Sequence, residues 1–210
     1  MTATRRRLAP EVRRAQLIAA AEDVFVRRGY QGAAVEDIAA AAGVTRTLIY
    51  KYFADKDEIY LECLRAARDE LDQAVVAAAG GAEGPEAQLR AGLRAYFDFV
   101  RDRGSTWDVL FGGGAAVAGR VAEAAAEHRY QTAEVIGGLV HGAAPQVDAE
   151  AASAYAHAIS GAAEQIAKWW RRHPDVPVEV MVERMMDALW VGLRAVATDA
   201  DGSEGLGSPA

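Results

Sequence analysis

The sequence predicts an all-α fold, on three observations. Apolar residues recur at intervals of three and four, which is the period of a helix with one buried face. No run alternates Val, Ile or Thr with polar residues, as a half-buried strand would. Of the 210 residues, 51% are hydrophobic and 25% are charged, so the chain can bury a core and is not a disordered protein.

Helix-breaking residues divide the chain into about nine helical segments. Pro10 suits the start of the first helix, and Gly29 suits its end. Three segments are short, near residues 35–42, 46–52 and 105–111. The other breaks are predicted at Gly43, Ala79–Pro85, Gly112–Gly114, Gly142–Pro145 and His173–Pro177. The tail 199–210 is rich in Gly, Ser and acidic residues, and we expect it to be disordered.

Several functional classes are excluded by composition and spacing. The single cysteine, Cys63, can form neither an internal disulfide nor a Cys-based zinc site, and the four histidines do not fall at metal-ligand spacings. No stretch is long and apolar enough for a membrane span, and no apolar core follows the N-terminal arginines, as in a secretory signal. No nucleophile elbow or phosphate loop is present. We therefore expect a cytoplasmic protein that is not an enzyme, without catalytic residues, metal or cofactor.

Two short helices in the first quarter of the chain have the spacing of a helix-turn-helix. The small side chain of Ala39 lets the helices approach, and Gly43 supplies the positive φ that closes the turn. Val44 and Ile49 hold the second helix to the first by apolar contact, and the Thr45 hydroxyl is placed to cap that helix.

Because Ile49 points inward, the solvent face of the second helix follows from spacing. Arg46 and Tyr50 are four residues apart, as are Thr47 and Lys51, so the members of each pair lie close together. Guanidinium, ammonium, phenol and hydroxyl groups bind base edges and phosphates. The apolar side chain of Leu48 could contact a thymine methyl group.

The following helix is predicted to begin at Asp55, with Glu58 three residues later in a capping-box pattern. This places Lys56 and free backbone N–H groups at a helix N-terminus, where a phosphate is favoured.

These motifs resemble the DNA-binding domain of the TetR family, over residues 11–65. The resemblance is carried by Gly29-Tyr30, by the run Val35–Arg46 and by the run Leu48–Glu58. It implies a one-component transcriptional regulator, usually a repressor, that binds a palindromic operator in double-stranded DNA as a homodimer. It also implies a small-molecule effector that weakens DNA binding.

The resemblance implies a set of DNA-contacting residues. They are Thr45, Arg46, Thr47, Leu48, Tyr50, Lys51, Tyr52 and Lys56. Among them, Tyr50 and Lys56 are expected to contact phosphates, whereas Arg46 and Thr47 are candidates for base readout. Two departures are notable. Ala33 and Ala34 stand where the family usually has Ser or Thr before the helix, and Thr47 stands where it often has Gly, Ala or Pro.

The remaining chain, 66–198, is expected to bind the effector and to form the dimer. Wide apolar stripes on its last two long helices suit burial on two sides, and we predict a four-helix interface with two helices from each subunit. The alternative is that both stripes face only the internal core. The predicted interface residues are Ile159, Ala163, Ile166, Trp170, Met181, Met185 and Leu189.

Candidate effector-binding residues are aromatic or polar side chains within otherwise apolar segments, because ligand pockets combine apolar walls with a few polar groups. They are Tyr96, Phe99, Trp107, Phe111, His128, Tyr130, Tyr155, His157 and Glu164. For each residue singly, core packing or plain exposure is the alternative. The effector itself is expected to be largely apolar.

The net charge of −7 conceals a regional difference. Residues 1–60 contain ten Lys and Arg against eight Asp and Glu, which gives +2, and residues 61–210 contain thirteen against twenty-two, which gives −9. The basic arm, residues 1–10, could reach a phosphate or a minor groove, or could be a solvated tail. The acidic total therefore does not exclude nucleic acid as a partner. The alternative function is that of a helical small-molecule-binding protein or enzyme that does not act on DNA.

Overall fold

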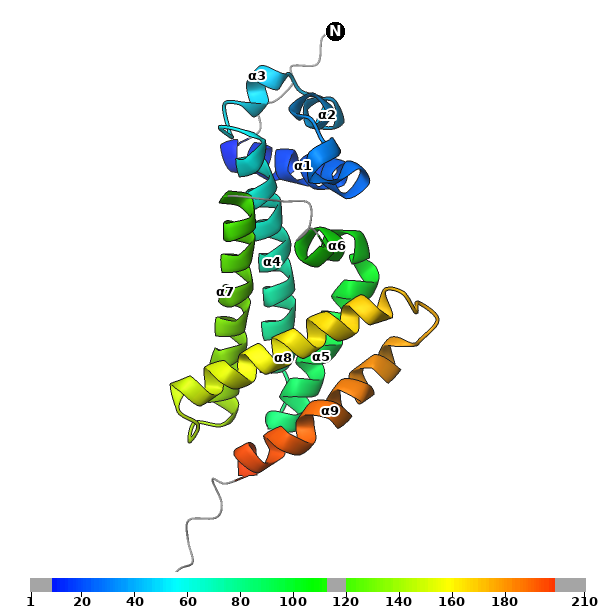
Figure 1. Ribbon diagram of the computed structural model, residues 1–210. Helices are drawn as coiled ribbons and strands as arrows, with labels where there is room; N and C mark the ends of the chain where they lie inside the picture. Colours follow the sequence, from blue (N-terminus) through cyan, green and yellow to red (C-terminus); the bar gives the residue numbers. More distant parts are fainter. Residues whose placement is uncertain (1–8, 113–119, 199–210) are drawn as a thin grey trace, which may run out of the picture. The chain divides into compact units, whose positions relative to one another are not determined.

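The computed structural model describes residues 9–112 and 120–198, with side chains except at 109–110, 112, 120–122, 124–130 and 195–198. Over these ranges the chain forms nine helices and no strand, which confirms the predicted all-α class (Figure 1). The helices are α1 Pro10–Gly32, α2 Val35–Ala41, α3 Arg46–Ile49, α4 Lys56–Gly80, α5 Pro85–Asp102, α6 Gly104–Gly112, α7 Arg120–Ala143, α8 Ala149–Trp170 and α9 Val178–Thr198.

Most helix boundaries follow the predicted breaks. Pro10 occupies the first turn of α1, and Pro85 begins α5, since a proline needs no N–H donor there. Gly29 differs from the prediction. Its φ of 67° and ψ of 170° kink α1, and a further turn then runs on to Gly32. The predicted arm and tail fall largely outside the described residues, as do Gly113 and Gly114.

The chain divides into two compact units, each with its own packing. The first unit comprises Met1–Ala67 and Ser105–Ala126, and the second comprises Arg68–Gly104 and Glu127–Ala210. The predicted domain boundary after residue 65 stays a prediction. Residues 105–126, which lie within the predicted second domain, are grouped with the first unit. Among the described residues, no helix has the length and apolarity that a membrane crossing requires.

The core of the first unit joins α1, α2 and α3 to the start of α4. Leu17 and Phe25 of α1, Ile38 of α2 and Ile49 of α3 are almost completely buried. The ring of Tyr60 on α4 meets that of Phe25 edge to face, with centroids 5.0 Å apart. This apolar packing positions the two short helices of the turn motif against the longer ones.

The core of the second unit includes α5, α8 and α9. The ring of Phe97 on α5 packs edge to face on Trp170 of α8, with centroids 5.7 Å apart. Arg94 of α5 pairs with Glu179 of α9 at 3.2 Å, and Arg90 of α5 pairs with Glu183 of α9.

This core contains part of the predicted dimer interface. Five of the predicted interface side chains are buried by their own chain, namely Ile159, Ala163, Trp170, Met181 and Met185. The centre of each apolar stripe is thus covered within a single chain, and the interface stays a prediction. Ile166 and Leu189, at the margins of the stripes, are half-buried.

Candidate DNA-binding surface

The turn between α2 and α3 depends on one glycine. Gly43 has a φ of 64°, and a Cβ placed there would meet no atom within 4 Å. The glycine is therefore required for its backbone conformation and not for space. The N–H of Val44 donates to the carbonyl of Ala39 at 3.0 Å, which closes the turn as the sequence predicts.

Helix α3 is short and is held at both ends. The Thr45 hydroxyl accepts a hydrogen bond of 3.3 Å from the N–H of Leu48, which confirms the predicted cap. Ile49 is fully buried, and the packing of α3 against α2 orients the helix. The side chains of Arg46, Thr47 and Tyr50 are consequently exposed.

Arg46 and Tyr50 form one group on this exposed face. The guanidinium of Arg46 donates to the Tyr50 hydroxyl at 3.1 Å and lies 5.2 Å from the centre of that ring. Its Nη1 lies 2.5 Å from the carboxylate of Glu36 on α2. The hydrogen bond to Tyr50, followed by the charge of Glu36, raises the pKa of Arg46, so the group is a permanent cation.

A groove runs beside this group. Its lining includes Gly43, Val44, Thr45, Thr47, Leu48 and Lys51 together with Arg13 of α1. Arg13, whose guanidinium donates to Gln16 at 2.7 Å, adds a cation to this lining. Arg13 is not among the predicted DNA contacts, and the signal that could have found it is the seven arginines against three acidic residues in residues 1–28.

The start of α4 has the predicted capping pair, and the helix begins at Lys56, one residue later than expected. Asp55 precedes the helix, and its carboxylate accepts from the N–H of Glu58 at 2.8 Å. The Glu58 carboxylate accepts in return from the N–H of Ala54 at 2.6 Å. The first of these bonds occupies one of the helix N–H groups that the sequence suggested for a phosphate.

Lys56 has intramolecular partners in this structure. Its ammonium group donates to the carbonyls of Tyr30 at 2.9 Å and Ala33 at 3.2 Å, and lies 4.4 Å from the centre of the Tyr30 ring. The side chain joins the end of α1 to the start of α4. A structural role thus accompanies the predicted phosphate contact. Tyr52, another predicted contact, is half-buried.

The Ser or Thr cap that is missing at Ala33 and Ala34 is partly replaced by Asp37. Ala34 has no side-chain acceptor, but its N–H donates to the Asp37 carboxylate at 3.1 Å. The same carboxylate pairs with Arg28 at 2.5 Å. Asp37 therefore organises the start of α2 from within the helix.

The predicted effector residues do not come together in one described cluster. Trp107 and Phe111 stack with centroids 4.9 Å apart and belong to the first unit, where Trp107 is buried. In the second unit Phe99 is buried, whereas Tyr96 and Tyr155 are half-buried. His157 is exposed, and Glu164 pairs with Lys168 at 2.5 Å. The side chains of His128 and Tyr130 lie outside the described residues.

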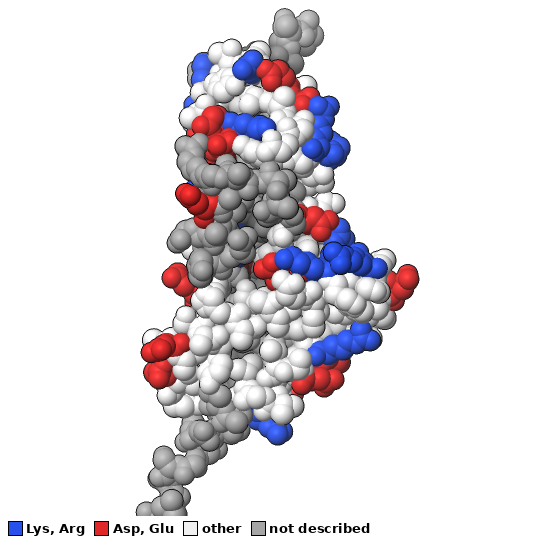
Figure 2. Space-filling model, viewed as in Figure 1, with Lys and Arg blue, Asp and Glu red and all other residues white. Residues whose placement is uncertain are grey.

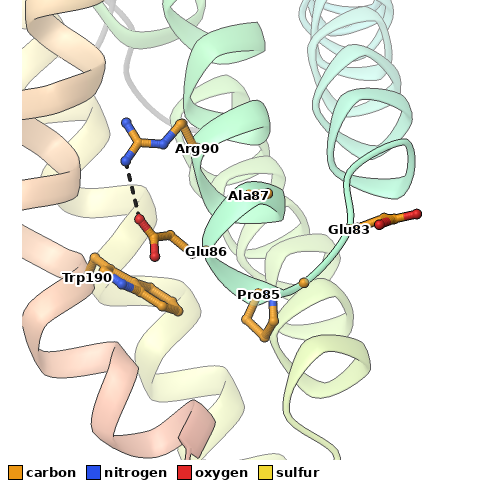
Figure 3. A pocket seen from close by; sticks show the side chains of 7 residues that line it. Glu83, Pro85, Glu86, Ala87, Arg90 and Trp190 are labelled. Atoms are coloured by element: carbon orange, nitrogen blue, oxygen red, sulfur yellow. Dashed lines mark hydrogen bonds and ion pairs between the residues drawn. The ribbon is translucent and has the colours of Figure 1, made fainter.

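A hollow in the second unit uses other residues, which sequence reasoning missed. Glu83 to Ala87, Arg90 and Trp190 line it. Figure 3 shows Trp190 of α9 opposite Pro85 and Glu86 at the start of α5, where Glu86 pairs with Arg90 at 3.4 Å. Among the described residues, no group of three His, Cys, Asp or Glu side chains is placed to hold a metal ion.

Comparisons with known proteins bear directly on this arrangement. The family model described as bacterial regulatory proteins, tetR family, matches residues 17–63, and the one described as Tetracyclin repressor-like, C-terminal domain, matches residues 85–192. The HTH-type transcriptional activator FasR of Mycolicibacterium smegmatis is 37% identical over 105 residues, which cover 50% of this chain and 48% of that protein. The chain thus spans about half the length of this relative.

Solved structures of similar chains have the same fold. A TetR-like transcriptional regulator from Rhodococcus sp. RHA1 is 26% identical with a TM-score of 0.67, over 90% of this chain and 99% of that one. A tetR-family regulator from Streptomyces coelicolor is 28% identical with a TM-score of 0.70, over 93% of this chain and 86% of that one. The second family model covers just over half of the chain. With its helix-turn-helix and its helical C-terminal part, the chain belongs to the TetR family of transcriptional regulators.

Proposed function

We propose that this protein is a ligand-responsive repressor that binds a palindromic operator as a homodimer. The observation that carries the proposal is the exposed face of α3, where Arg46, Thr47 and Tyr50 stand outward because Ile49 is buried beneath them. A basic face on a recognition helix supplies both phosphate contacts and base readout. Thr45, Leu48, Lys51, Tyr52 and Lys56 complete the proposed contact set.

The direct test is binding to the duplex DNA upstream of the protein's own gene. We expect a salt-sensitive complex that Arg46→Ala weakens, measured by fluorescence anisotropy. A transcription assay on the same promoter then separates repression from activation. Failure to bind this DNA or any selected duplex at low salt would favour the alternative, a helical binding protein or enzyme that does not act on DNA.

The dimer is proposed to use the outer faces of α8 and α9. Trp169 on α8 and Val180 and Val191 on α9 are exposed large apolar side chains, with exposed fractions of 42%, 37% and 68%. Figure 2 shows mainly uncharged side chains over these two helices. Two such faces, one from each subunit, would form a four-helix interface and place two helix-turn-helix motifs on one operator.

Sedimentation velocity tests this interface. We expect the wild type to sediment as a dimer, and Val191→Asp to shift it toward the monomer because it places a charge in the apolar contact. The matched control is Val12→Asp, which makes the same change at an exposed valine of α1, outside the proposed interface. A wild-type monomer at micromolar concentration would contradict the homodimer.

The effector is proposed to bind the C-terminal part of the chain. It would favour a conformer of the dimer in which the distance between the two helix-turn-helix motifs no longer matches the half-site spacing of the operator. Support for this comes from the family model of the C-terminal domain, which matches residues 85–192. Screening largely apolar small molecules for release of the bound duplex tests this. A compound that raises the melting temperature without changing DNA affinity would be a ligand but not an effector.

A further inference from the structure

Glu36 is an acidic residue of the helix-turn-helix, where a negative charge opposes the binding of DNA phosphates. It lies in the first turn of α2, and its exposed carboxylate meets Nη1 of Arg46 on α3 at 2.5 Å. The contact therefore crosses from one helix of the turn motif to the other. The Glu36 carboxylate offsets the positive charge of Arg46, the residue that the proposed function assigns to base readout.

Arg46 is held from two sides. Its Nη1 meets Glu36, and its Nη2 donates to the Tyr50 hydroxyl at 3.1 Å. Each terminal nitrogen of a guanidinium carries two N–H groups, so each contact leaves a second N–H on the same nitrogen for a base. A guanine presents O6 and N7 to such a fork in the major groove.

Fixing the guanidinium before DNA arrives has a thermodynamic consequence. An unrestrained arginine loses rotamer freedom on binding, whereas a held one has already lost part of it. The negative charge also penalises a shift of Arg46 toward the nearest phosphate. Both effects favour the base contact over backbone-only binding.

We propose that Glu36 is a specificity-determining residue that positions Arg46 for a guanine in each half-site and disfavours sequence-independent binding. This inference rests on the proposed function, because it requires that α3 reads DNA. Glu36 acts through Arg46 and does not itself contact a base.

The test is selection of bound duplexes from a random pool by the full-length protein, followed by affinities for the selected and a scrambled duplex. Arg46→Lys keeps the positive charge but removes the paired N–H donors of the guanidinium, so it identifies the base position that Arg46 reads. We expect Glu36→Gln to flatten preference at that same position. The ratio of specific to scrambled affinity should fall about 3- to 10-fold, mainly because binding to scrambled DNA strengthens.

Three variants separate orientation from charge. Glu36→Asp keeps the charge but shortens the side chain, and should also weaken preference at the Arg46 position. Asp23→Asn removes an acidic charge at an exposed residue of α1, elsewhere on the first unit, and should leave base preference unchanged. In an Arg46→Lys background, Glu36→Gln should change nothing further at that position, because the two residues act as a unit.

The outcomes separate the two proposals. If the wild type enriches a motif and Glu36→Gln enriches the same motif with equal discrimination, the inference about Glu36 is overturned while the proposed function stands. A change at positions that Arg46→Lys leaves unaltered also overturns it. If the wild type enriches no motif, the proposed function fails and the inference fails with it. Circular dichroism confirms that each variant remains folded.

Discussion

The Thr106 hydroxyl donates a hydrogen bond of 2.6 Å to the carboxylate of Glu22, which joins α6 to α1 within the first unit. Thr106 is 5% exposed, so the bond is shielded from water. Next to it, Trp107 is 2% exposed. Residues 105–126 thus belong to the unit that carries the helix-turn-helix, although in sequence they lie within the C-terminal family model.

Thr106→Val is expected to destabilise the protein by about 1–3 kcal/mol, because a carboxylate in a shielded site loses a hydroxyl donor. Urea unfolding monitored by circular dichroism gives the free energy of unfolding. Thr106→Ser keeps the hydroxyl and should recover most of the loss. Equal stability of the valine and wild-type proteins would show that the bond contributes nothing net.

Lys56→Met should both destabilise the first unit and weaken DNA binding. The carbonyls of Tyr30 and Ala33 lose a charged donor, which we expect to cost about 1–2 kcal/mol. Affinity for DNA should fall evenly across sequences, as for a phosphate contact. Lys51→Met is the control. Lys51 is exposed on the helix-turn-helix, so this substitution should lower the affinity for DNA without changing the thermal stability. An unchanged melting temperature for Lys56→Met would contradict the structural role.

Gly43→Ala is expected to cost about 1 kcal/mol or more, because its φ of 64° disfavours any side chain although there is room for a methyl group. Gly32→Ala is the matched control. A Cβ at Gly32 would lie 3.6 Å from the Cβ of Arg28, an ordinary contact, and the residue has no positive φ. Thermal unfolding of both variants separates backbone strain from crowding, and a larger loss at Gly32 would contradict this account.

Thr45→Ala should weaken both stability and DNA affinity, because a four-residue helix depends strongly on its cap. The loss of the hydroxyl acceptor for the Leu48 N–H is expected to cost about 1 kcal/mol. Thr45→Ser retains the acceptor and should behave like the wild type in calorimetry and in anisotropy. If serine and alanine weaken DNA binding equally, the methyl group and not the cap is responsible.

Cys63 makes stability depend on pH under alkaline conditions. Burial, followed by the nearby carboxylates of Glu22 and Glu62, raises the pKa of this thiol. In the unfolded chain the thiol ionises near its ordinary value of 9.0, whereas the folded protein keeps the proton. The protonated thiol of Cys63 therefore contributes its full stabilisation below pH 9.0. As the pH rises above that value, the free energy of unfolding falls by about 1.4 kcal/mol per pH unit.

Comparing the wild type with Cys63→Ala by urea unfolding between pH 8 and pH 10 isolates this effect. The wild type should lose stability more steeply above pH 9.0. Parallel curves for the two proteins would show that the buried thiol is not the cause.

The sequence alone determined the features whose causes are local. The positive φ of Gly43, the Thr45 cap and the inward direction of Ile49 each depend on a few neighbouring residues, and all three were predicted correctly. The helix boundaries at Pro10 and Pro85 follow from the missing N–H of proline for the same reason.

Only the tertiary structure decided which of several possible partners each side chain meets. The periodicity of α8 does not distinguish Trp170, buried on Phe97, from its neighbour Trp169, which is exposed. Nor does spacing reveal that Lys56 binds the carbonyl of Tyr30, 26 residues earlier. Local backbone preferences act through neighbours in sequence, whereas burial and ion pairing depend on contacts between distant segments, which exist only once the helices have packed.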